Sequence, residues 1–114
     1  MEKIKYTTMT IITRREKLST LYNILMKFGI PGMTITEVEG NGQQLGSINY
    51  IQDGLQKAKL IPKIMVEVSY TDIDTEKLIE AICENLRTNI MGDGKIFIEE
   101  NEGYFEKVRS IDEK

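Results

Sequence analysis

The chain contains no histidine and only one cysteine. Histidine is the usual general base near neutral pH and the commonest transition-metal ligand, so its absence disfavours a triad hydrolase and a zinc enzyme. Cys83 cannot form an internal disulfide, and its place among the apolar positions of an expected helix assigns it to core packing. Binding is therefore favoured over catalysis, and we expect a protein that is not an enzyme.

The chain also lacks a long apolar stretch and an excess of positive charge. No apolar run approaches the ~20 residues that span a bilayer, and the first residues lack the apolar block of a signal peptide, so we expect a cytoplasmic protein. The net charge is -3, whereas nucleic-acid binders need a broad positive face, so we expect no nucleic acid among the partners. Any phosphate-binding site must be local.

The composition that remains is typical of a globular domain. With 114 residues, 40% of them hydrophobic and 29% charged, the chain is near the commonest domain size and long enough to bury a core. We expect a single domain over residues 1–114. Within it, residues 41–60 are expected as a long loop and residues 100–114 as a polar tail.

The first half of the sequence predicts strand, helix and strand. Residues 4–13 are rich in β-branched and aromatic types, which is typical of a strand. Thr13 and Glu16 have the spacing of a capping box, so we expect a helix to begin there and to end at Gly29. Its apolar stripe comprises Leu18, Leu21, Tyr22, Leu25 and Met26. Residues 33–38 alternate in polarity, which predicts a second strand.

The second half repeats this plan. Residues 64–70 alternate in polarity and predict a third strand. Asp72 and Asp74 offer capping oxygens for a second helix. Its apolar stripe comprises Leu78, Ile79, Ile82, Cys83 and Leu86. Residues 95–99 predict a fourth strand.

The order βαββαβ predicts an α+β fold, a ferredoxin-like sandwich with a four-stranded antiparallel sheet and both helices on one face. Met9, Ile11, Met65 and Phe97 indicate apolar atoms on both sides of the sheet, so we expect more than one subunit to cover the open face. The long connection at residues 41–60 is typical of a lid, switch or docking arm, with a disordered insertion or a hairpin as the alternative.

The residues Gly92, Asp93, Gly94 and Lys95 join the second helix to the fourth strand. Two glycines allow positive φ and the close approach of a ligand, their amides can bond phosphate oxygens, and the lysine adds a positive charge. The same residues also suit an ordinary tight turn. If the chain holds a polyphosphate, its basic residues must cluster there. The other candidates are Lys63, Lys107 and Arg109.

Four stretches carry a resemblance that covers nearly the whole chain: residues 29–38, 40–46, 61–68 and 87–97. In this order and spacing they resemble the PII signal-transduction family of nitrogen and energy sensors. The resemblance implies a homotrimer whose intersubunit clefts bind ATP or ADP. It also implies that the long loop changes shape with the ligand and docks on a target, such as a membrane transporter or a metabolic enzyme.

The resemblance further implies a set of nucleotide contacts. The turn from Gly92 to Lys95 wraps the phosphates, Thr34 and Thr88 lie by the base or ribose, and Lys107 and Arg109 reach the phosphates from the tail. The implied contacts are Thr34, Gly42, Gln44, Thr88, Gly92, Asp93, Gly94, Lys95, Lys107 and Arg109. The family has arginine where Lys107 stands, so the charge is kept but the bidentate fork is lost.

Family members also bind 2-oxoglutarate beside Mg-ATP, through a glutamine and a lysine that match Gln44 and Lys63. The family's basic residues beside that glutamine are Gln43 and Leu45 here, which removes two positive charges, so 2-oxoglutarate stays an open prediction. No metal ligand is expected from protein side chains other than Gln44 with bound ATP.

The loop departs from the family in two further places. Gln56 stands where the family has a modifiable tyrosine, and Gln52 replaces the arginine that enters an ammonium channel. Uridylylation and an ammonium transporter as target are therefore disfavoured.

Two other functions are alternatives to the one that the resemblance implies. A small ferredoxin-like enzyme of the acylphosphatase type needs an arginine-bearing phosphate loop near the N-terminus, and Arg14 and Arg15 stand there without glycines around them. A sheet-surface RNA binder needs exposed aromatics and a basic charge balance, and only Phe97 is suitably placed.

Overall fold

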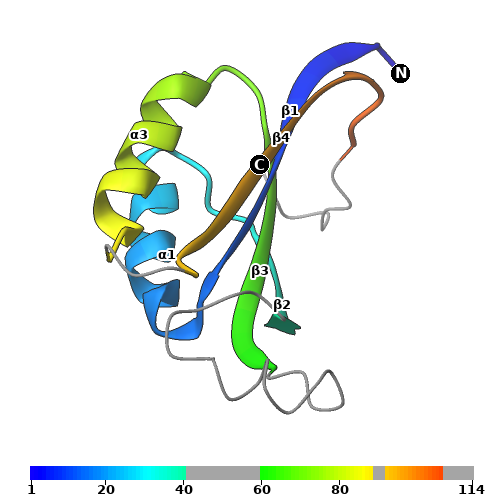
Figure 1. Ribbon diagram of the computed structural model, residues 1–114. Coiled ribbons are helices and arrows are strands. Elements are labelled where there is room, and N and C mark those ends of the chain that lie inside the picture. Colours follow the sequence, from blue (N-terminus) through cyan, green and yellow to red (C-terminus); the bar gives the residue numbers. More distant parts are fainter. Residues whose placement is uncertain (41–59, 89–91, 107–114) are drawn as a thin grey trace, which may run out of the picture.

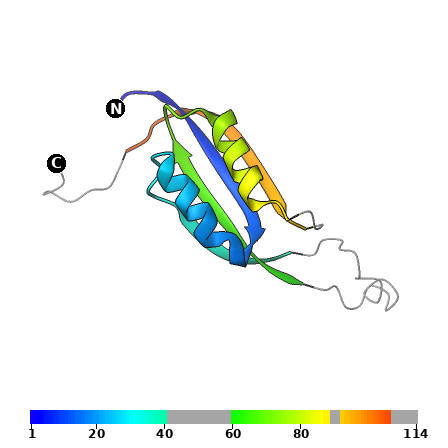
Figure 2. The same cartoon turned by 90° about the vertical axis from the view of Figure 1, so that its left-hand side faces the viewer.

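The computed structural model describes residues 1–40, 60–88 and 92–106. The elements in chain order are β1 (Ile4–Arg14), a 3-10 turn (Arg15–Lys17), α1 (Leu18–Lys27), β2 (Thr34–Gly40), β3 (Ile61–Tyr70), α3 (Thr75–Leu86) and β4 (Gly94–Gly103). All strand pairs are antiparallel in the order β2-β3-β1-β4, and both helices cover one face of the sheet (Figures 1 and 2). The predicted ferredoxin-like fold is confirmed.

The core lies between this sheet and the two helices. The central strands β1 and β3 turn alternate residues toward the helices, and each buried aliphatic side chain stabilises the fold by ~1.5–3 kcal/mol. The largest fully buried hydrophobic side chains are Met9, Ile11, Leu21, Leu25, Ile64, Val66, Leu78 and Ile82. No helix among the described residues is long and apolar enough to cross a membrane.

The start of α1 differs from the prediction, and its end confirms it. Thr13 does not cap the helix, because β1 continues to Arg14 and the 3-10 turn separates the strand from α1. At the other end Gly29 has φ +81°, and the N–H groups of Gly29 and Ile30 donate to the carbonyls of Met26 and Leu25. This is a Schellman motif, which requires a residue with positive φ.

The predicted helix stripes are partly correct. In α1, Leu21 and Leu25 are buried together with Ile24, whereas Tyr22 is 44% exposed and Met26 is similarly exposed. In α3 the buried residues are Leu78, Ile82 and Leu86, and Ile79 and Cys83 lie half-buried at the flank. In each helix, the predicted stripe residues that directly follow a buried residue along the chain are therefore only partly buried and lie at the flank of the sandwich.

The N-cap of α3 is Asp74, as predicted, because its carboxylate accepts the N–H of Lys77 at 3.2 Å. Asp72 does not cap the helix and instead has φ +60° in the preceding turn. The third and fourth strands are longer than predicted by three residues or more. The third begins at Ile61, and β4 extends to Gly103 because residues 100–103 pair with β1, so the expected polar tail begins inside the sheet.

Apolar residues lie on both sides of the sheet, including the open face. Met65 and Phe97 lie there, as predicted, and Phe97 is 52% exposed. Met9 and Ile11 lie on the other side, because both alternate onto the helix side of β1 and are buried, so the prediction of apolar residues on both sides of the sheet is confirmed. Ile12, opposite Met65, also faces the open side.

Candidate anion-binding site

The turn before β4 requires glycine at both ends. Gly92 has φ +94° and Gly94 has φ +130°, a region that side-chain-bearing residues rarely adopt. A Cβ atom on Gly94 would lie 1.9 Å from the carbonyl oxygen of Ile12. The start of β4 therefore lies in close backbone contact with the end of β1, which places the turn beside Thr13 and Arg14.

Asp93 connects this turn to its neighbours through its side chain. The carboxylate accepts the backbone N–H of Thr88 at 2.8 Å and also the Thr88 hydroxyl, and the Arg14 guanidinium lies 3.5 Å away. The hydrogen bonds from Thr88 lower the pKa of Asp93 below its ordinary value, with a smaller contribution from Arg14, against the opposing effect of desolvation. Asp93 is therefore anionic and already engaged by protein groups.

Three cations, Arg14, Lys63 and Lys95, lie around the glycine turn, and Arg14 is the one that contacts the carboxylate. The ammonium of Lys63 donates to the carbonyl of Gly92 at 2.6 Å. Burial lowers the pKa of Lys63, and the nearby charges of Arg14 and Lys95 lower it further, whereas Asp93 raises it. Arg14 and Lys63 also stand directly opposite each other on β1 and β3, where like charges destabilise a sheet. The cluster therefore carries a local excess of positive charge that an anion would neutralise.

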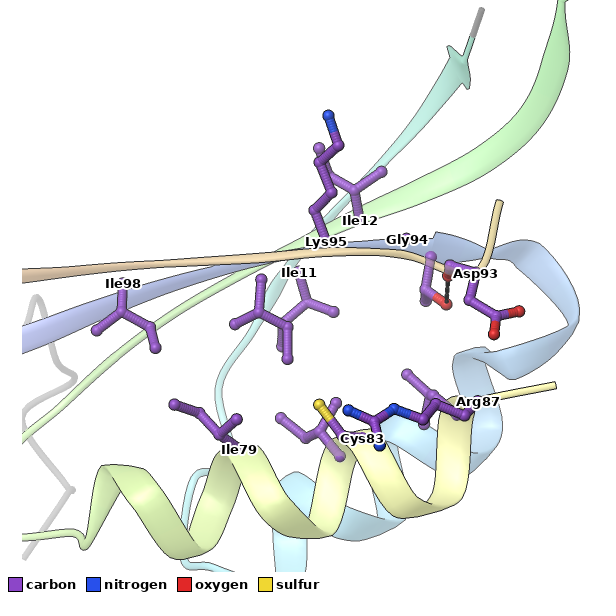
Figure 3. A pocket seen from close by; sticks show the side chains of 13 residues that line it. Ile11, Ile12, Ile79, Cys83, Arg87, Asp93, Gly94, Lys95 and Ile98 are labelled. Atoms are coloured by element: carbon purple, nitrogen blue, oxygen red, sulfur yellow. Dashed lines mark hydrogen bonds between the residues drawn. The ribbon is translucent and has the colours of Figure 1, made fainter. Parts of the chain in front are cut away.

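Lys95 extends away from α3, on the side of the sheet that the helices leave open (Figure 3). The strand registers place Arg14 and Lys63 on the same side, since Lys95 pairs with Ile12, and Arg14 pairs with Lys63. The three basic groups thus share one end of the open face in a chain of net charge -3. We call Arg14, Lys63, Lys95 and the turn from Gly92 to Gly94 the cationic end.

Sequence reasoning found part of this cluster. Lys63 and Lys95 were predicted, and Thr88 lies against the turn, where its hydroxyl binds Asp93. The sequence connects Arg14 only with an acylphosphatase loop, because its place opposite Lys63 follows from the strand register, which no local pattern shows. Thr13 was assigned to a helix cap, and its hydroxyl instead donates to the carbonyl of Asp93 at 2.9 Å.

Thr34 lies far from the cationic end within one protomer. It opens β2 at one edge of the sheet, whereas Gly94 opens β4 at the other edge. Thr34 instead lines a separate cavity of about 830 Å³. The other side chains that line it include four with a hydroxyl group and one phenyl ring: Tyr6, Thr8, Ser69, Thr71 and Phe105. Gly42, Gln44, Lys107 and Arg109 lie outside the described residues.

An apolar groove of about 490 Å³ runs beside the turn, between α3 and β4. Ile79 and Cys83 of α3 face Ile11 and Ile98 of the sheet, and Arg87 lies at the end nearest Asp93 (Figure 3). The aliphatic lining suits an apolar side chain. Within the described ranges, no group of three or more histidine, cysteine, aspartate or glutamate side chains could hold a metal ion.

An acylphosphatase loop does not form around the two N-terminal arginines. Arg14 is the last residue of β1 and pairs with Asp93, and Arg15 pairs with Glu37 at 3.0 Å. The side chains of Arg14 and Arg15 therefore point to different partners. The site has the composition of a binding site, with donors and cations gathered around a turn.

Comparison with known proteins identifies the class. Residues 6–104 match the family described as Nitrogen regulatory protein P-II, and the chain belongs to this family. Proteins of this family are signal-transduction regulators and not enzymes, and they act through partner proteins and small-molecule ligands. The class of protein expected from the sequence is confirmed.

Individual relatives agree with the family match. The chain is 43% identical over 89 residues to Nitrogen regulatory protein P-II 1 of Methanothermobacter thermautotrophicus, covering 78% of this chain and 77% of that protein. It is 32% identical over 91 residues to nitrogen regulatory protein GlnK of Escherichia coli, covering 80% and 81%.

Two solved structures share the fold. The structure of GlnK from B. subtilis superposes with a TM-score of 0.68 at 25% identity and covers 86% of each chain. A crystal structure of Arabidopsis thaliana PII bound to citrate superposes with a TM-score of 0.62 at 30% identity, covering 82% of this chain and 75% of that one.

Proposed function

We propose that this regulator binds ATP and ADP at the cationic end and controls a target protein through residues 41–60. The observation that carries the proposal is the gathering of Arg14, Lys63 and Lys95 around a turn with two positive-φ glycines, in a chain of net charge -3. Such a turn presents backbone amides, and neighbouring cations complete a phosphate site.

We propose further that each site is completed by a second copy of the chain, within a homotrimer. Three strand spacings and three residues of register separate Thr34 from Gly94, which is ~14 Å across the sheet and ~10 Å along it, or about 17 Å in all. If the β2 edge of one copy lies against the β4 edge of the next, Thr34 and its hydroxyl-lined cavity approach the neighbour's cationic end.

The exposed apolar residues support this arrangement. At the β2 edge Ile35 is 45% exposed beside Tyr22 of α1, and at the β4 edge Ile98 is 38% exposed beside the groove under α3. The two surfaces differ, so their contact is heterologous, and heterologous contacts close into rings when the rotation allows it. A trimeric ring would cover both surfaces in every copy.

A link between the site and residues 41–60 runs through Lys63. A Cβ atom on Gly40, the last described residue before that segment, would lie 3.3 Å from the Cδ atom of Lys63. The same lysine bonds the carbonyl of Gly92. A ligand that draws the ammonium away from Gly92 would therefore move the stem against which Gly40 packs. Such a ligand shifts the loop only by its differential affinity for the loop's arrangements.

We also propose 2-oxoglutarate as a second effector beside Mg-ATP, with Lys63 and Gln44 as its contacts. The relative from Arabidopsis thaliana is described as bound to citrate, which, like 2-oxoglutarate, is a polycarboxylate. Arg14 and Lys63 supply positive charge for a dicarboxylate, which offsets part of the loss at Gln43 and Leu45. The target of the loop is proposed to be a transporter or a metabolic enzyme in the cytoplasm or at its membrane.

Titration calorimetry tests the nucleotide site. The wild-type protein should bind ATP and ADP, and Lys95→Gln should weaken both about tenfold or more, since a charge-assisted hydrogen bond contributes ~1.5–3 kcal/mol. Lys5→Gln is the matched control, because it removes the same charge from the opposite end of the sheet, where Lys5 is exposed. If neither ATP nor ADP produces heat of binding at millimolar concentration, the proposal is refuted.

Two further measurements test the proposed 2-oxoglutarate site and the acylphosphatase alternative. Heat from 2-oxoglutarate should appear only when Mg-ATP is present, and binding without nucleotide would contradict the shared site. The protein should release no phosphate from ATP or from an acyl phosphate. Turnover that is lost in Arg14→Ala would favour the acylphosphatase alternative instead.

A further inference from the structure

Apart from Tyr70, whose hydroxyl bonds Thr75, Thr13 is the only buried side chain with a polar group in the part of the chain the structure describes. It is 2% exposed, near the end of β1, on the side of the sheet that faces the helices. A buried hydroxyl lowers stability unless it has a hydrogen-bond partner. Its partner is the carbonyl oxygen of Asp93, at 2.9 Å. A residue of this kind at this place requires a reason beyond packing.

The bond from Thr13 fixes the orientation of one peptide group in the glycine turn. The peptide between Asp93 and Gly94 is planar and trans, so its N–H points opposite to its C=O. The carbonyl points toward Thr13, on the helix side of the sheet. The N–H of Gly94 is therefore directed toward the side on which Arg14 and Lys95 lie.

The other acceptors of the turn are also engaged by the protein. The carbonyl of Gly92 accepts the ammonium of Lys63, and the carboxylate of Asp93 accepts both donors of Thr88. These acceptors are therefore already occupied, and among the amides of the turn it is that of Gly94 which the geometry directs toward Arg14 and Lys95. This arrangement suits an anion and repels a cation.

We propose that Thr13 is a positioning residue of the anion site, which holds the Gly94 amide toward the phosphates of the nucleotide. This inference rests on the proposed function and extends it to a residue that touches no ligand. In a Thr13→Val variant the carbonyl of Asp93 loses its partner in a buried place, and rotation of the peptide toward another donor moves the Gly94 amide. Thr13→Ser keeps the hydroxyl and should keep the amide in place.

The test compares four variants by calorimetry with ATP and by amide NMR of ¹⁵N-labelled protein. Thr13→Val should weaken the binding of ATP about 5–10-fold, which corresponds to the loss of one hydrogen bond. Thr13→Cys, whose thiol is a weak donor of similar size, should behave like valine if the valine variant does not fold. Thr13→Ser should bind within about twofold of wild type. Thr7→Val is the control, on the same strand and face at the far end.

A purely structural role would lower stability and leave the ligand response of the turn unchanged. We expect instead that ATP shifts the Gly94 amide resonance in wild type and Thr13→Ser, and that this shift is much smaller in folded Thr13→Val or Thr13→Cys. Equal ATP affinity in wild type and either folded variant would overturn the inference and leave the proposed function standing. If wild type binds neither nucleotide, the proposed function fails and the inference fails with it.

Discussion

Replacement of Gly94 by alanine should damage the protein far more than the same change at Gly29 or Gly32. The added Cβ atom would lie 1.9 Å from the carbonyl oxygen of Ile12, whereas ordinary contact begins at 3.4 Å. The start of β4 must therefore move away from β1 by roughly 1.5 Å, which strains the ladder and the bond between Thr13 and Asp93. The φ of +130° adds a conformational cost.

The magnitude follows from these contributions. The unfavourable φ costs ~1–2 kcal/mol, and two disturbed hydrogen bonds cost ~1 kcal/mol each, which gives about 3–4 kcal/mol. For a domain of this size that loss lowers the melting temperature by roughly 10–20 °C. Two controls separate the causes. Gly29 has φ +81° but nothing within 4 Å of an added Cβ atom, and Gly32 has an equally open site with no φ in the left-handed range.

Melting curves followed by circular dichroism at one fixed protein concentration measure all three variants, because association makes the melting temperature depend on concentration. Gly29→Ala should lower the free energy of unfolding by ~1 kcal/mol, because alanine is strained at this positive φ. Gly32→Ala should be neutral or gain up to ~1 kcal/mol, since alanine restricts the unfolded chain. A Gly94→Ala variant that melts no lower than Gly29→Ala would show that β4 and β1 are not in close contact, and the described geometry of the turn would be wrong.

Three further predictions concern the same site. A mixture of Thr34→Val and Lys95→Gln subunits, refolded together in equal amounts, should recover about one quarter of the wild-type nucleotide sites. Each site in the ring takes Thr34 from one copy and Lys95 from the next, so about one site in four combines an unaltered Thr34 with an unaltered Lys95. No recovery would refute the intersubunit site. The pKa of Asp93 lies below 3.8, so its stabilisation is complete above that pH and is lost as the pH falls through the lowered pKa. Urea unfolding of wild type and Asp93→Asn should accordingly converge in acid, and a constant difference would contradict this. Arg14→Gln should raise the pKa of Lys63 toward 10.5, as measured by NMR titration of its Cε, and a fall would refute the clustering of the two charges.

Local sequence signals predicted most of the fold. Alternation in polarity marked the strands, Gly29 marked the end of α1, and Asp74 marked the start of α3, because each depends on neighbours within a few residues. The capping-box prediction at Thr13 was wrong because the structure there depends on residues far away in the sequence. Pairing with β3 and β4 extends β1 to Arg14, and such long-range pairing outweighs a local capping pattern.

The sequence by itself determined the order of the elements, the glycine turn from Gly92 to Gly94 and the presence of lysines near it, since these follow from local conformation and residue type. The tertiary structure decided which side chains meet. Antiparallel register placed Arg14 opposite Lys63, directed the Thr13 hydroxyl to Asp93, and put Thr34 on the far edge of the sheet. Register depends on contacts between residues about 20 to 100 positions apart, and no local pattern in the chain encodes which of them align.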